Sequence, residues 1–124
     1  MAKFLATLDK GTFKNYKEIY TSPTISTGQL TLDLSLGNIF NVSLNGNITT
    51  MTITNIPSSS FTANFSLIFT ADGTARAVAW TSSIKWPSGI APTLTSTNGK
   101  RDAFAFVTLD GGTNWYGFVG GQNI

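Results

Sequence analysis

The stretch VAWTSSIKWPSGIAPTLTSTNGKRDAFAFVTLDGGTNWYGFVGG, residues 78–121, holds most of the information on the fold of this chain. It contains all three tryptophans of the protein. Within it, the segment 102–109 has apolar side chains on both faces, and Asp110-Gly111-Gly112 then supplies the residues of a tight turn. An aromatic run, Trp115–Phe118, follows. Two extended segments joined by such a turn predict a β-hairpin near the C-terminus.

Upstream of this stretch, apolar residues recur at every second position, which is typical of half-buried strands. The strands predicted over the whole chain are 30–36, 40–44, 48–53, 61–70, 75–80, 93–96, 102–109 and 114–119. Asn45-Gly46 predicts a type I′ hairpin turn between two of them. The spacing of strands and turns predicts an all-β domain over residues 25–124: an antiparallel β-sandwich, jelly-roll-like, with about eight strands.

Residues 1–24 differ from the rest and predict a short N-terminal arm. The formal charge of +2 comes from this region, because the other charged residues balance. The basic residues of the arm are Lys3, Lys10, Lys14 and Lys17. Two interpretations stay open: the arm docks onto a partner or a neighbouring subunit, or it is a terminal strand and loop that pack on their own domain.

The composition argues against several classes of function. Histidine and cysteine are both absent, so the usual general base, disulfides and cysteine-based metal sites are missing. Charged residues make up only 11% of the chain, without the dense basic stripe of a nucleic-acid protein. No apolar run is long enough to span a bilayer, and the first residues lack a signal-peptide pattern. We therefore expect no catalysis, no cofactor, no nucleic-acid partner and no membrane insertion.

The few carboxylates give little sign of a catalytic pair. Asp72 and Asp110 each precede a glycine, which favours a role in turns. Asp102 follows Lys100-Arg101 and is expected to pair with them locally. A calcium site that uses Asp72, Asp102 or Asp110 with loop carbonyls stays open, although the spacing matches no EF-hand loop.

The large aromatic residues have two interpretations. Most such residues in a domain of this size lie in the core or at a subunit interface. The candidates for that role are Trp80, Phe104, Phe106, Trp115 and Phe118. Trp86 lies in a predicted loop between Lys85 and Pro87, so Trp86 and Tyr116 are the candidates for an exposed contact with a ligand such as a sugar.

The run KWPSGIAPTLT (85–95), followed by NGKRDAFAFVTLDGGTNWYGF (98–118), resembles a domain common in bacteriophage virion proteins, especially tail fibres. The resemblance extends over about residues 27–123 and leaves the arm outside. The positions that match its pattern are Lys85, Trp86, Pro87, Gly89, Pro92, Leu94, Thr95, Gly99, Asp102, Phe104, Phe106, Asp110, Gly111, Gly112, Thr113, Trp115, Tyr116 and Gly117.

The resemblance implies a non-enzymatic structural protein of the virion, often a homotrimer, that contacts other virion proteins. Copies of the domain usually end long fibre chains, whereas this sequence is short and starts at Met1. That departure predicts a small fibre, a fibre tip or a capsid decoration protein docked through its arm. The alternative is a carbohydrate-binding module that recognises a host-surface glycan.

Overall fold

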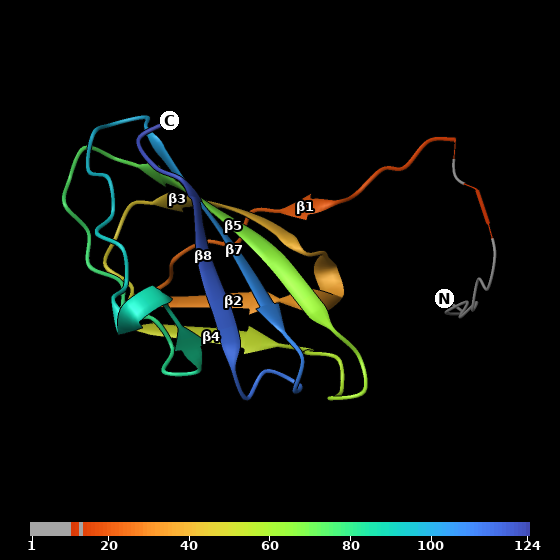
Figure 1. The fold of residues 1–124 in the computed structure, drawn as a ribbon. Helices are drawn as coiled ribbons and strands as arrows, with labels where there is room; N and C mark the ends of the chain where they lie inside the picture. Colours follow the sequence, from red (N-terminus) through yellow and green to blue (C-terminus); the bar gives the residue numbers. More distant parts are fainter. Residues whose placement is uncertain (1–10, 13) are drawn as a thin grey trace.

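The computed structural model describes residues 11–12 and 14–124, which form eight strands in two sheets (Figure 1). The strands are β1 (Tyr20–Thr21), β2 (Gln29–Asp33), β3 (Ile39–Leu44), β4 (Thr50–Thr54), β5 (Ala63–Ala71), β6 (Ile84–Lys85), β7 (Arg101–Thr108) and β8 (Trp115–Gly121). Two short 3₁₀ turns, η1 (Leu34–Leu36) and η2 (Pro87–Gly89), are the only helical elements of the described residues. None of the described helices could cross a membrane.

The larger sheet has six strands in the order β1-β3-β5-β7-β8-β6, and the smaller sheet pairs β2 with β4. In the larger sheet, β1–β3, β3–β5 and β6–β8 are parallel, whereas β5–β7 and β7–β8 are antiparallel. The small sheet is parallel. The predicted antiparallel, jelly-roll-like sandwich is therefore wrong: the protein is mostly β, with a mixed and largely parallel main sheet.

The parallel pairs arise because the chain alternates between the two sheets. It passes from β2 in the small sheet to β3 in the large one, back to β4, and again to β5. Each return places a strand beside, and parallel to, the strand two before it. Asn45-Gly46 consequently lies in a connection between sheets and not in a hairpin, which corrects that expectation. The predicted hairpin at Asp110–Gly112 does form, between β7 and β8.

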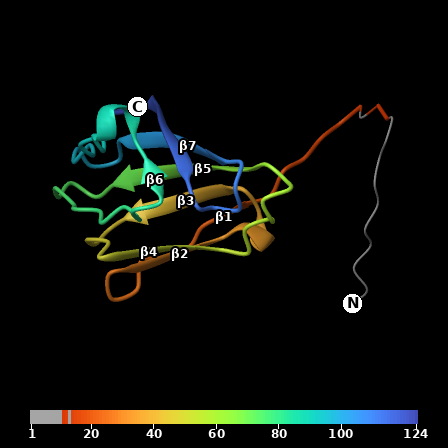
Figure 2. The same cartoon turned by 60° about the horizontal axis from the view of Figure 1, so that its bottom comes forward.

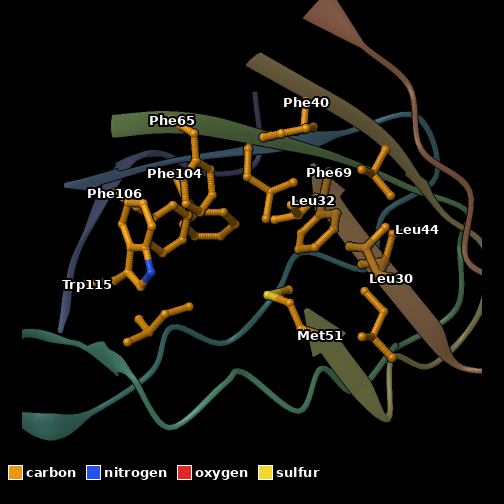
Figure 3. Close-up of a cluster of buried hydrophobic side chains, with 14 of the residues drawn as sticks. Leu30, Leu32, Phe40, Leu44, Met51, Phe65, Phe69, Phe104, Phe106 and Trp115 are labelled. Atoms are coloured by element: carbon orange, nitrogen blue, oxygen red, sulfur yellow. The ribbon is translucent and has the colours of Figure 1, made fainter. Parts of the chain in front are cut away.

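One hydrophobic core fills the space between the sheets, where the apolar rows predicted by the alternation meet (Figure 3). The large sheet contributes aromatic side chains, and the small sheet contributes Leu30, Leu32 and Met51. Figure 2 shows the small sheet lying along one side of the large one. The long connection 72–100 covers the rest of the core and packs Val78 and Trp80 against it. The predicted strands 75–80 and 93–96 lie in this connection, where the first makes a single bridge at Val78 and the second makes none.

The arm predicted over residues 1–24 divides into two parts. Its last residues form β1, which pairs with Ile39 and Phe40 of β3, so this part packs on its own domain. The segment Lys14–Ile19 is exposed throughout and runs away from both sheets (Figures 1 and 2). Lys14 and Lys17 lie in this exposed segment, whereas Lys3 and Lys10 lie outside the described residues.

Candidate interaction surface

The outer face of the large sheet is not covered by any second layer of the described chain, and we call it the open face (Figure 2). The strand register places five residues from five adjacent strands in one row across it. The row is Tyr20, Ile39, Ser66, Ala105 and Phe118. Small side chains occupy its middle and large ones its ends. Such a row suits contact with another protein surface because apolar area there can be buried without first removing charge from water.

A second row on the open face joins Asn64, Val107 and Tyr116 and ends at Lys85 of β6. The exposed aromatic groups of this face are Tyr20 at one side, 63% exposed, and Tyr116 and Phe118 of β8, which are 46% and 53% exposed. Among the described strand residues, charge occurs on this face only at Arg101 and Lys85, near its corners. The face is thus neutral and partly apolar in its centre.

The other side of β8 is buried at Trp115 and Gly117. Trp115, Phe104 and Phe106 are at most 2% exposed and belong to the core. Trp80 is partly buried and packs on that core. Phe118 is the exception among the five residues assigned to core or interface, because it points to the open face and is exposed. Alternate residues of β8 therefore have different positions: Trp115 lies in the core, whereas Tyr116 and Phe118 lie on the open face.

Trp86 is only 8% exposed, so the expectation that it contacts a ligand at the surface is wrong. Its ring lies edge-on to Trp80, at 5.0 Å between ring centroids, and to Phe106, at 5.6 Å. The reason is that β6 pairs with the start of β8 and η2 then turns the chain away, which folds the tryptophan inward. Since Trp86 packs in the core and Tyr116 lies on the open face, the two side chains cannot form one sugar-stacking platform.

The two halves of the recognised sequence pattern meet at Gly117. A Cβ atom added there would lie 3.0 Å from the Trp86 ring and 3.2 Å from the side chain of Ile84. Both neighbours are buried, so neither has room to move. The WYG triplet therefore needs glycine at position 117, because Trp86 of the KWP triplet packs directly on the backbone of β8 there.

We expect Gly117→Ala to lower the free energy of unfolding by about 1–3 kcal/mol, because the added methyl group overpacks the core. Denaturant unfolding measures the change. The matched control is Gly46→Ala, whose added Cβ meets only Ile25, at an ordinary 3.8 Å, and which should change stability by about 0.5 kcal/mol or less. Equal stability of the two variants would contradict the packing described for Trp86.

Asp102 is a buried carboxylate with an anchoring role. It is 2% exposed and accepts hydrogen bonds from the backbone N–H groups of Thr95, at 2.7 Å, and Asn123, at 3.0 Å. The Gln122 side chain donates a third bond at 3.2 Å. Burial raises the pKa of Asp102, but these hydrogen bonds outweigh it and leave the pKa below its usual value. The expected pairing with Lys100-Arg101 is wrong.

This role of Asp102 was missed although the sequence carried a signal for it. The residue stands two positions before Phe104 and four before Phe106, on the face of the strand that alternation assigns to the core. A charged residue in a core row requires hydrogen-bond partners. Here the carboxylate ties the 93–95 loop and the last residues of the chain to β7.

The other aspartates are also occupied by local hydrogen bonds. Asp110 accepts from the backbone N–H and the side-chain amide of Asn114, both at 2.9 Å, and from the hydroxyl of Thr108. The Asn114 bonds, first the backbone one, lower the pKa of Asp110. Asp72 forms an ion pair with Arg76. No group of three or more potential metal-ligating side chains occurs among residues 11–12 and 14–124, so Asp72, Asp102 and Asp110 do not come together as a calcium site.

None of the family models, curated proteins or solved structures compared with this chain matches it. The resemblance to phage virion domains consequently rests on the sequence pattern alone. The structure adds that the residues of this pattern fall mainly in the core and in turns. Among the exposed surfaces of the described residues, the open face and the edge of β8 carry Tyr116, Phe118 and Val119 close together.

Proposed function

We propose that this chain is a non-enzymatic structural protein of a phage virion, a small fibre, fibre tip or capsid decoration protein that acts by assembly. The observation that carries the proposal is the open face, which bears Ile39, Tyr116 and Phe118 and has charge only near its corners. An apolar patch of this kind favours association with another protein surface. The resemblance of residues 27–123 to virion domains supplies the biological setting. The most economical way to cover such a face is symmetric self-association, for which we propose a homotrimer.

Light scattering on the full chain tests the assembly. We expect a mass three times the 13.2 kDa of one chain. Replacing Phe118 by lysine should reduce this mass toward that of one chain, because it places a charge among the apolar side chains of the open face. The control Phe61→Lys changes an equally exposed phenylalanine outside the open face, with 66% of its surface accessible, and should leave the mass unchanged.

Mass spectrometry of purified virus particles that encode this chain tests the setting. We expect the chain in several copies per particle. Its absence from the particles, together with a single-chain mass in solution at every concentration, would contradict the proposed function. The carbohydrate-binding alternative would be favoured by two results together. The protein would have the mass of one chain in solution, and it would bind a glycan that the Tyr116→Ala variant does not bind.

A further inference from the structure

The edge of the large sheet at β8 is only partly covered. β6 pairs with Trp115 and Tyr116 and then ends. From Phe118 to Gly121, no backbone hydrogen bond joins β8 to any described residue other than those of β7. Backbone groups along a strand face its two sides alternately, so the outward-facing groups of this segment, those of Val119 among them, have no protein partner in the described part of the chain.

Proteins usually protect such an edge with a charge, a proline or a covering loop. The segment Gly117–Gly121 contains neither a charged residue nor a proline, and its pairing with β7 is irregular opposite Ala103 and Phe104. Phe118 is 53% exposed on the open face, and Val119, the next residue, is 46% exposed. The edge is therefore uncharged and carries an exposed apolar side chain on each face of the strand. These are the properties of a strand that accepts another strand.

A matching donor leaves the sheet at its opposite edge. Lys14–Glu18, which ends just before Ile19 and β1, makes no backbone hydrogen bond to any residue in the described ranges 11–12 and 14–124. Tyr16 is 74% exposed and Ile19 is 73% exposed. In an extended strand these two side chains, three positions apart, point to opposite faces. The segment thus offers one apolar group to each face of the strand that it joins.

We propose that Lys14–Ile19 of one copy of this chain adds as a strand along Gly117–Gly121 of a second copy. The lengths agree, since six extended residues span about 20 Å and five span about 17 Å. The donor and the acceptor lie at opposite edges of the same sheet, four strand spacings or about 19 Å apart. Because the donor runs away from its own sheet, the acceptor belongs to a neighbour (Figure 1).

The symmetry of this contact agrees with the proposed trimer. A donor edge that meets an acceptor edge of the next copy is a head-to-tail contact, which closes into a ring of three when each copy is rotated by a third of a turn from the last. A reciprocal exchange of arms between two copies would instead give a dimer, which the measured mass distinguishes from a trimer. The inference rests on the self-association put forward above and identifies the segments that hold the copies together. The open face of neighbouring copies would then lie beside the added strand, with Tyr16 near the aromatic groups of β8.

Two variants test the pairing by light scattering. Val119→Lys places a charge on the acceptor edge, and deletion of residues 1–19 removes the donor while keeping β1. Both should convert the trimer into single chains and leave thermal unfolding of the single chain unchanged, since Val119 is half-exposed. The control Leu109→Lys alters a 64% exposed apolar residue of the β7–β8 turn and should keep the trimer. A Val119→Lys variant that remains a trimer would overturn the pairing and leave the virion function standing.

Cross-linking tests the contact directly, because the chain contains no cysteine of its own. Mixing a Lys17→Cys copy with a Val119→Cys copy and adding a short bis-maleimide should link the two different copies in high yield. The control mixes Lys17→Cys with Ser43→Cys, on β3 at the donor side of the sheet, and should give little product. Equal yields would overturn the pairing. A single-chain mass for the unaltered protein would overturn it as well, whereas finding the chain in virus particles would still support the structural function.

Discussion

Replacing Trp115 with alanine is expected to lower the free energy of unfolding by about 4 kcal/mol, the largest effect of any single substitution that the structure suggests. The side chain is completely buried. Its ring lies edge-on to Phe65, at 5.0 Å between centroids, at one end of the buried cluster (Figure 3). Truncation removes this contact and leaves a cavity. The cavity cannot close by a shift of β8, because β8 is paired with both β6 and β7. Denaturant unfolding at neutral pH measures the loss.

The control for this experiment is Phe61→Ala. Phe61 is also aromatic but precedes β5 and is 66% exposed, so its truncation should cost about 0.5 kcal/mol or less. A difference between the two variants of less than about 1 kcal/mol would contradict the position of Trp115 in the core. It would also weaken the assignment of its neighbour Tyr116 to the open face, because the two assignments depend on the same alternation.

Replacing Asp102 with asparagine is expected to cost about 3 kcal/mol at neutral pH. The substitution removes a buried charge that accepts hydrogen bonds from Thr95, Asn123 and Gln122, and bonds of this kind contribute about 1.5–3 kcal/mol each. The new amide group also brings an N–H toward donors that need an acceptor. The control Asp72→Asn breaks only the exposed pair with Arg76 and should cost about 0.5 kcal/mol.

The pH dependence provides a second check on Asp102. Its pKa is lower in the folded protein than in the unfolded chain, so its stabilising effect is fully present above the unfolded value of about 3.9 and is lost as the pH falls through the folded one. The gap in stability between the unaltered protein and Asp102→Asn should therefore narrow below about pH 4. If the difference in unfolding free energy between the two proteins stays constant down to pH 2, the charge of the Asp102 carboxylate does not contribute to stability.

The sequence predicted which side chains are buried better than it predicted how the strands pair. Alternation in 61–70 placed Phe65, Leu67 and Phe69 on one face, and these three are buried. It also predicted strands where β3, β5, β7 and β8 lie. Alternation reports only which face of a strand meets the core, and strands of two different sheets facing one core have the same pattern. A hairpin and a connection between sheets could thus not be told apart at Asn45-Gly46.

The candidate surface was predictable only in part, for a related reason. Tyr116 was singled out for an exposed contact and Phe118 for the core or an interface, and both lie on the open face. Trp86 was misplaced because a tryptophan beside a lysine and a proline in a turn looks exposed when only its neighbours in the sequence are considered. What buries it is Gly117, 31 positions later, where the missing side chain leaves room for the ring. No local pattern contains that information.

The alternation of the chain between its two sheets also bears on the order in which the protein folds. Among the described strands, β7 and β8 are the only neighbours in a sheet that are also consecutive in the sequence. The two strands of every other pair are separated in the sequence by at least one strand, and non-local pairing of this kind slows folding. During synthesis this local pair leaves the ribosome after the other described strands, together with Trp115 and with Gln122 and Asn123, which bind Asp102. The apolar rows of the earlier strands therefore stay exposed to solvent until the β7–β8 hairpin has been synthesised and can complete the core.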